Sequence, residues 1–131
     1  MRFRLVTPAR ELLDLEVEEV YAPGVLGQFG VLPLHVNFLT ALETGELRYR
    51  ASGKEHFLAV SGGICEVLED VVTVLADAAE PAGEIDVERA RLAERNASSR
   101  LQDLEPDTPE GIDTRSALER AQNRLKVAAR A

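Results

Sequence analysis

The chain of 131 residues contains a single cysteine, Cys65, and only two histidines. One thiol cannot form an internal disulfide, and no histidines and cysteines are grouped at the spacing of a metal site. Cys65 lies in an apolar run, which is typical of a buried and chemically inert thiol. The sequence therefore predicts no disulfide and no metal centre, and it fits a reducing, cytosolic compartment.

Basic residues are in the minority: 15 Lys and Arg stand against 23 Asp and Glu, for a net charge of −8. This balance argues against a nucleic-acid-binding protein, because phosphate contacts dominate such binding. The charge is also uneven. Residues 1–84 contain 6 basic and 14 acidic side chains, whereas residues 85–131 contain 9 of each. The two parts of the chain are therefore different kinds of sequence.

Charged residues are absent from Val20 to Leu42, a stretch long enough for a membrane helix. Pro23, Pro33 and three regularly spaced glycines interrupt any helix there. The segment instead predicts turns, short strands and an uncharged surface that another molecule covers. The chain begins Met-Arg-Phe-Arg and continues directly into a strand pattern, so we expect no signal peptide and no direct membrane insertion.

Enzyme signatures are missing as well. The sequence has no phosphate loop, no Gly-x-Ser-x-Gly elbow, and no nucleophile with a base and an orienting partner. Gly24, Gly27 and Gly30 have the wrong spacing for a dinucleotide fingerprint and are better explained by tight turns. We therefore expect a protein without catalytic residues of its own.

The first part of the chain has the pattern of β-structure. Leu13, Leu15 and Val17 alternate with acidic residues, as in a half-buried strand, and a change of phase at Glu18–Glu19 predicts a bulge. Further runs cover 46–51, 55–61, 63–68 and 71–76. Short strands at this spacing indicate a sandwich or a barrel. The runs 57–60 and 71–76 are apolar on both faces, as expected where two sheets close on each other.

The pattern becomes helical after residue 84. Asp86 suits an N-cap, with Ile85 and Ala90 as a hydrophobic staple. The segment 105–111 ends this helix, and Ile112–Asp113 predicts a second helix capped by Asp113. Apolar positions recur at three- and four-residue spacing at Ala90, Ala93, Ala97, Leu101 and Leu104, and again at Leu118, Ala121, Leu125 and Ala128. We expect an antiparallel helical hairpin over 85–131, after a β domain over 1–84.

The predicted seam of this hairpin is mostly alanine, which buries little apolar area. Helices of this length are marginal on their own. The hairpin is therefore either an ordinary packed appendage or an element docked weakly enough to be switched. Composition leaves both alternatives open.

Several motifs in order resemble the epsilon subunit of bacterial F-type ATP synthase. They are Gly24-x-x-Gly27-x-x-Gly30-Val31-Leu32-Pro33-x-His35, Leu39-Thr40-Ala41, Ser61-Gly62-Gly63-Ile64-x-Glu66-Val67, Val72-Thr73-Val74-Leu75-Ala76, Ile85-Asp86-Val87-Glu88-Arg89-Ala90 and Asn123-Arg124-Leu125. The resemblance covers essentially the whole chain. Family members usually carry glycine where Leu34 stands and proline where Asn37 stands, so the loop around His35 is a place where this chain departs from the family.

The resemblance implies a β-sandwich of about ten strands followed by a two-helix antiparallel hairpin. It implies a non-catalytic central-stalk subunit that couples the rotor to the catalytic head. The partners would be the gamma subunit, the ring of c subunits and, in an extended state of the hairpin, the alpha/beta head. The location would be peripheral, at the cytoplasmic face of the bacterial inner membrane. Gln28 falls at a ring-contact position and His35 at a gamma-facing position.

A regulatory role follows from the same resemblance. In related subunits the hairpin either folds against the sandwich or extends and obstructs ATP hydrolysis, and some members bind ATP in the folded form. No cofactor is required, and ATP is a candidate regulatory ligand. The matching positions here are Glu80, Ile85, Asp86, Arg89, Ala90, Arg120 and Arg124. A further family arginine is replaced by Asn96, which predicts weaker nucleotide binding.

Two other functions remain open at this stage. The chain could be a stand-alone sandwich-and-hairpin interaction module of another assembly, or a small nucleotide-sensing protein without a rotary role. Co-purification with a gamma subunit separates the leading hypothesis from the interaction module. Nucleotide titration identifies a sensor.

Overall fold

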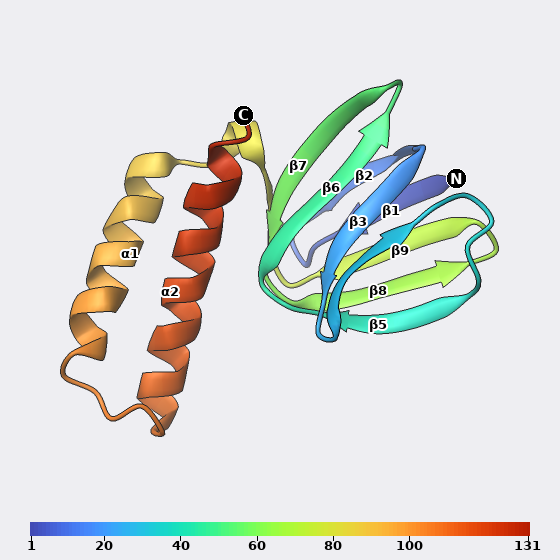
Figure 1. Cartoon of the computed structure of the whole chain (residues 1–131). Coiled ribbons are helices and arrows are strands. Elements are labelled where there is room, and N and C mark those ends of the chain that lie inside the picture. The colour runs from blue at the N-terminus through green and yellow to red at the C-terminus, as the bar shows by residue number, and fades with distance from the viewer. The chain divides into compact units, whose positions relative to one another are not determined.

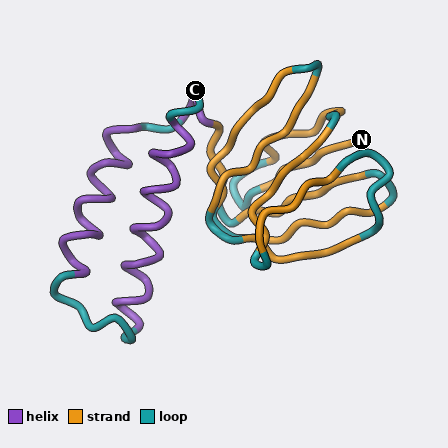
Figure 2. Tube along the Cα trace, in the orientation of Figure 1, coloured by secondary structure: helices purple, strands orange, loops and turns teal.

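The computed structural model describes residues 1–131 and contains ten strands, a short 3₁₀ turn and two helices (Figure 1). The chain divides into two compact units, residues 1–81 and residues 82–131. All strands belong to the first unit and both helices to the second (Figure 2). The predicted fold class, a β-sandwich followed by a two-helix hairpin, is confirmed.

The N-terminal unit is one curled sheet with mainly antiparallel neighbours. Its strands are β1 (Arg2–Val6), β2 (Glu11–Glu16), β3 (Glu19–Gly24), β4 (Gly27–Val31), β5 (Phe38–Leu42), β6 (Gly45–Ala51), β7 (Lys54–Val60), β8 (Gly63–Leu68), β9 (Val71–Ala76) and β10 (Ala79–Pro81). The order across the sheet is β10-β7-β6-β3-β5-β8-β9-β1-β2, and β4 pairs with β3. One pairing, between β1 and β9, is parallel.

The core lies between the inward faces of this sheet. Alternation in strands such as β1, β8 and β9 sends one set of side chains inward, whereas Leu58, Ala59 and Val60 of β7 are all buried, as expected for a run covered on both faces. The largest fully buried side chains are Phe3, Leu5, Val20, Val31, Leu47, Leu58, Val60, Cys65, Val67, Val72 and Val74. Burial raises the pKa of the Cys65 thiol to about 12, with a smaller contribution from the neighbouring Glu66 carboxylate.

Two expectations about these strands were wrong. The change of phase at Glu18–Glu19 marks a break between β2 and β3, and no single bulged strand runs through it. The β9 run is also not covered on both faces, because Leu75 is 45% exposed while Val72 and Val74 are buried. One sheet face therefore keeps apolar side chains in contact with solvent.

The second unit begins with the 3₁₀ turn η1 (Ala82–Glu84), followed by α1 (Val87–Leu101) and α2 (Pro109–Ala128). Asp86 caps α1 as predicted, since its carboxylate accepts a hydrogen bond from the backbone N–H of Arg89 at 3.1 Å. The predicted start of the second helix at Asp113 was wrong. Thr108 is the N-cap of α2, its hydroxyl accepts from the N–H of Gly111 at 3.1 Å, and Pro109 occupies the first turn.

The two helices lie side by side and run in opposite directions (Figure 1). Small residues dominate their buried positions, as the sequence predicted; those below 10% exposure are Ala90, Ala97, Gly111, Thr114, Ala121 and Val127. A Cβ at Gly111 would lie 2.2 Å from the carbonyl oxygen of Glu105, so only glycine fits there. Neither helix has the length and apolar character needed to span a bilayer.

Candidate functional site

The segment between β4 and β5 forms a tight turn at Leu32–His35. The N–H of His35 donates to the carbonyl of Leu32 at 3.1 Å, and Leu34 has a φ of 65°. Proline at the second position and a positive φ at the third identify a type II turn. The third position normally carries glycine, because a Cβ is strained there. Here it carries a leucine whose side chain is 87% exposed.

Two hydrogen bonds tie this loop to the β8–β9 turn, more than thirty residues away in the sequence. The N–H of Leu34 donates to the Asp70 carboxylate at 2.9 Å, and the N–H of Glu69 donates to the side-chain oxygen of Asn37 at 3.0 Å. Glu69 and Asp70 themselves have positive φ values, as a two-residue hairpin turn requires. We call these two hydrogen bonds the loop brace.

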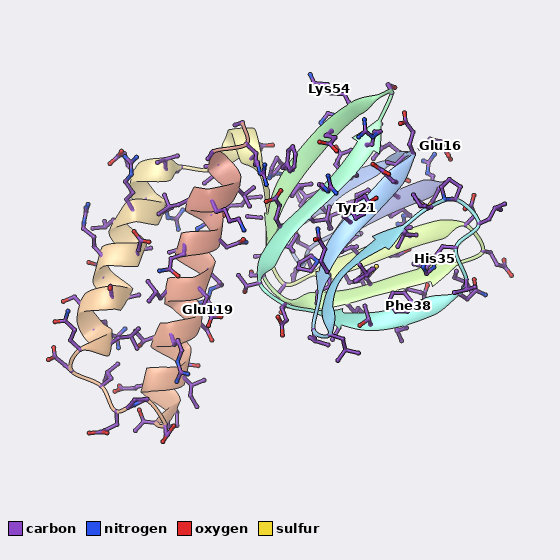
Figure 3. All side chains as sticks on the ribbon, in the orientation of Figure 1. Glu16, Tyr21, His35, Phe38, Lys54 and Glu119 are labelled. Carbon is purple, nitrogen blue, oxygen red and sulfur yellow. The ribbon has the colours of Figure 1, made fainter.

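His35 lies within this loop, half-buried, near Phe38 (Figure 3). Its Nδ1 lies 2.7 Å from the carbonyl oxygen of Val36, so Nδ1 carries the proton. The imidazole packs edge-on to Phe38 with 5.9 Å between ring centroids, and Phe38 packs in the same way against Phe29 at 5.2 Å. Gln28 is exposed on β4, opposite Pro23. No hydrogen bond or ring contact joins Gln28 to His35.

Beside this loop, the outward surface of three strands carries several exposed apolar side chains, with Glu66 and Thr73 among them. Ala41, Ile64 and Leu75 are direct cross-strand neighbours on β5, β8 and β9. Their surface also includes Leu39 and Leu68. Exposure reaches 64% at Leu39 and is between 43% and 47% at Ile64, Leu68 and Leu75. We call the five residues Leu39, Ala41, Ile64, Leu68 and Leu75 the β5–β8–β9 face.

The turn between β3 and β4 is a second exposed apolar element. Val25 is 45% exposed and Leu26 is 97% exposed, and Gly27 has a φ of 121° that suits only glycine. Phe29, three residues on, differs because it packs against the core. The uncharged 20–42 segment predicted from the sequence thus contains core residues and two exposed turns, one at Val25–Leu26 and one at Leu32–His35.

The residues predicted to bind ATP fall on several elements. Ile85 and Ala90 are buried at the start of α1, and Arg89 is exposed. Arg120 and Arg124 lie one turn apart on α2. Glu80 lies on β10, in the N-terminal unit, opposite Ala59.

A groove of about 330 Å³ is formed by residues of both helices. It is lined by Ala93, Asn96, Ala97, Arg100, Glu110, Asp113, Thr114 and Ala117. Of the positions compared with the family's nucleotide-binding residues, Asn96 lines this groove, whereas Arg89, Arg120 and Arg124 do not.

Sequence reasoning missed the loop brace. In the sequence Asp70 only falls between the runs 63–68 and 71–76, and Leu34 and Asn37 stand out only as departures from a family pattern. No local pattern links residues 34 and 70, so the pairing required the three-dimensional arrangement. No group of three or more His, Cys, Asp or Glu side chains is placed to bind a metal ion.

Known proteins match the chain over its whole length. The family described as ATP synthase, Delta/Epsilon chain, beta-sandwich domain matches residues 1–82, and the family described as its long alpha-helix domain matches residues 84–129. An ATP synthase epsilon chain of Citrifermentans bemidjiense is 47% identical, covering 100% of this chain and 95% of that protein. The epsilon chain of Anaeromyxobacter dehalogenans is 50% identical, covering 96% of each.

A solved structure agrees with the sequence matches. A chain in a structure of the OSCP, F1 and c-ring of the mitochondrial ATP synthase of Euglena gracilis superposes with a TM-score of 0.82 at 28% identity. The match covers 98% of this chain and 80% of that chain. The β-sandwich and the helical hairpin each match the corresponding family domain, and the similar proteins are epsilon chains. The chain therefore belongs to the ATP synthase delta/epsilon family as an epsilon-type member.

Proposed function

We propose that this chain is a non-catalytic central-stalk subunit of the proton-translocating ATP synthase, coupling the rotor to the catalytic head. Its partners are the gamma subunit and the ring of c subunits, at the cytoplasmic face of the bacterial inner membrane. The hairpin reaches the alpha/beta head when extended and then inhibits ATP hydrolysis. The exposed β5–β8–β9 face is the observation that carries the proposal.

Five apolar side chains in one cross-strand cluster lose hydration only when another surface covers them. Burying them contributes roughly 25 cal/mol per Å² of apolar area. Glu66 is the acidic residue within this surface, opposite Leu39. Glu66 is thus the acidic side chain among five apolar ones, and the face favours a protein partner with a mainly apolar contact region. We assign the face to gamma, and the Val25–Leu26 tip with Gln28 to the c ring.

A binding measurement with the cognate gamma subunit tests the proposal. The substitution Ile64→Glu places a second carboxylate on the face, between Ala41 and Leu75 and two residues from Glu66, without touching the core, because the Ile64 side chain is 43% exposed. We expect it to abolish binding while the free chain stays folded. Lys54→Glu, at the exposed start of β7 (Figure 3), is the matched control and should bind normally. Unchanged binding by Ile64→Glu would remove the face from the interface.

A regulatory ATP site is a second part of the proposal. Arg120 and Arg124 are one turn apart on α2, and like charges so placed repel by roughly 0.2–0.5 kcal/mol in an isolated helix. A triphosphate reverses this repulsion through charge-assisted hydrogen bonds. Asp86 is already engaged as the α1 cap, so its role is to fix the helix start. ATP then stabilises the folded hairpin only by its preference for that state.

A further inference from the structure

The turn at Leu32–His35 combines three features that internal packing does not explain. Leu34 adopts the left-handed conformation, which is strained for a non-glycine residue. Its side chain gains nothing from the core in return, being 87% exposed. Its backbone N–H is nevertheless held by the Asp70 carboxylate at 2.9 Å. Strain that persists at an exposed apolar residue is typical of a binding site.

We infer that Leu34 is an anchor residue for the gamma subunit, and that Asp70 and Asn37 are positioning residues that hold it ready for binding. The inference rests on the proposed function, because it needs gamma as the partner of the neighbouring β5–β8–β9 face. The loop is continuous with that face: Asn37 directly precedes β5, and Asp70 directly precedes β9.

The brace fixes the loop at the strained residue and again three residues further along the chain. The Asp70 carboxylate accepts a hydrogen bond from the N–H of Leu34. A type II turn leaves this N–H without a partner inside the turn. The side-chain oxygen of Asn37 accepts a hydrogen bond from the N–H of Glu69, so the loop also holds the β8–β9 turn. A loop already in its bound conformation avoids the ordering cost that weakens association. The brace therefore contributes affinity without contacting the partner.

Leu34→Gly separates this role from a structural one. Glycine keeps the turn and removes the strain, so the thermal stability of the free chain should stay the same or rise. Loss of the anchor should nevertheless weaken gamma binding roughly ten-fold or more. Leu34→Met keeps an apolar contact and should retain most of the affinity. A merely structural leucine would lose stability and affinity together, and that result would overturn the inference.

The positioning role needs variants that spare the turn backbone. Asp70→Gly tolerates the positive φ but removes the acceptor, and Asn37→Ala removes the second acceptor. Hydrogen exchange of the Leu34 amide should accelerate in Asp70→Gly, and that of the Glu69 amide in Asn37→Ala. Each variant should bind gamma roughly five-fold more weakly, the size of one hydrogen bond. Asp70→Asn keeps an acceptor oxygen and should bind gamma like the parent chain. Glu69→Ala, which leaves the donating backbone N–H in place, is the matched control and should also bind like the parent chain.

The outcomes distinguish this inference from the proposed function. If Ile64→Glu abolishes gamma binding while Leu34→Gly binds as tightly as the parent chain, the β5–β8–β9 face keeps its assignment to the gamma interface and the anchor role of Leu34 is wrong. If the exchange rates rise in the brace variants but their affinity is unchanged, the positioning role fails. If Ile64→Glu also binds normally, the β5–β8–β9 face is removed from the interface, and absence of gamma binding by the parent chain would overturn the proposed function itself.

Discussion

The guanidinium carbon of Arg48 lies 4.2 Å from the centroid of the Tyr21 ring, which is directly opposite it in the β3–β6 pair. On its other side Tyr21 faces Gly30 of β4, where a Cβ would come within 2.6 Å of the ring. The phenol ring thus covers bare backbone on one strand and contacts a cation on the next. Arg48 is held further by Glu55, at 3.1 Å.

Gly30→Ala should destabilise the N-terminal unit by about 1–2 kcal/mol, because the new methyl group displaces the Tyr21 ring and weakens its contact with Arg48. Gly83→Ala is the control, since its Cβ would meet nothing within 4 Å. Both tyrosines lie in the N-terminal unit, so tyrosine fluorescence during urea unfolding reports on that unit alone. Equal midpoints for the two variants would show that the ring moves without cost.

Leu26→Glu should weaken assembly with the membrane sector while leaving the unfolding midpoint of the free chain unchanged, because that side chain is 97% exposed. Phe29→Glu makes the opposite prediction. It places a charge against the core and should unfold the chain. Reconstitution on membranes stripped of the subunit measures the first effect, and thermal unfolding measures the second. A destabilised Leu26→Glu variant would make the tip structural.

Residues 1–81 should fold without the helices, because the core cluster of the sheet is drawn entirely from that unit. We expect a cooperative thermal transition and the tyrosine fluorescence of the full chain. An aggregated or molten fragment would mean that the sandwich depends on the hairpin for its stability.

Arg120→Ala and Arg124→Ala should each abolish or sharply reduce ATP binding, and Asn96→Arg should strengthen it by adding a phosphate-facing charge. Calorimetric titration of the parent chain at millimolar ATP is the measurement. At 100 times the dissociation constant, binding stabilises the folded state by about 2.7 kcal/mol. No heat and no thermal shift would leave the Asp86–Ala90 motif as a helix cap only.

Cys65 predicts a loss of stability at high pH. Burial raises its folded-state pKa from 9.0 to about 12, so the folded chain retains a proton that the unfolded chain releases. This contribution to stability is fully present below pH 9 and declines as the pH rises towards 12, by at most about 1.4 kcal/mol per pH unit. Cys65→Ala should flatten this part of the stability profile. In the native chain, thiol reagents should react only after unfolding.

The fold class was accessible from the sequence because alternation and helical periodicity are local. The strands at 63–68 and 71–76 and the Asp86 cap follow from nearest neighbours alone. The start of α2 was missed because two helix-start signals compete there. Asp113 follows an apolar residue and resembles a cap, whereas Thr108–Pro109 provides the stronger one: a hydroxyl acceptor followed by a residue whose missing N–H costs nothing in the first turn.

The exposure of Leu75 could not be predicted, because an apolar run has the same appearance whether it is buried on both faces or half-covered by a partner. The loop brace could not be predicted for a different reason. A backbone N–H carries no residue-specific signal, so nothing in the sequence marks Leu34 as the donor that Asp70 accepts.

The parallel pairing of β1 with β9 has a consequence for the order of events during synthesis. β1 is made before the other strands of this sheet, yet it lies between β2 and a strand that is made about seventy residues later. The β1–β2 hairpin can form early, but its second edge stays open until Ala76 has emerged. Folding dominated by such distant pairings is slow and exposes apolar strands meanwhile. β1 is therefore the strand of this sheet most dependent on protection by chaperones.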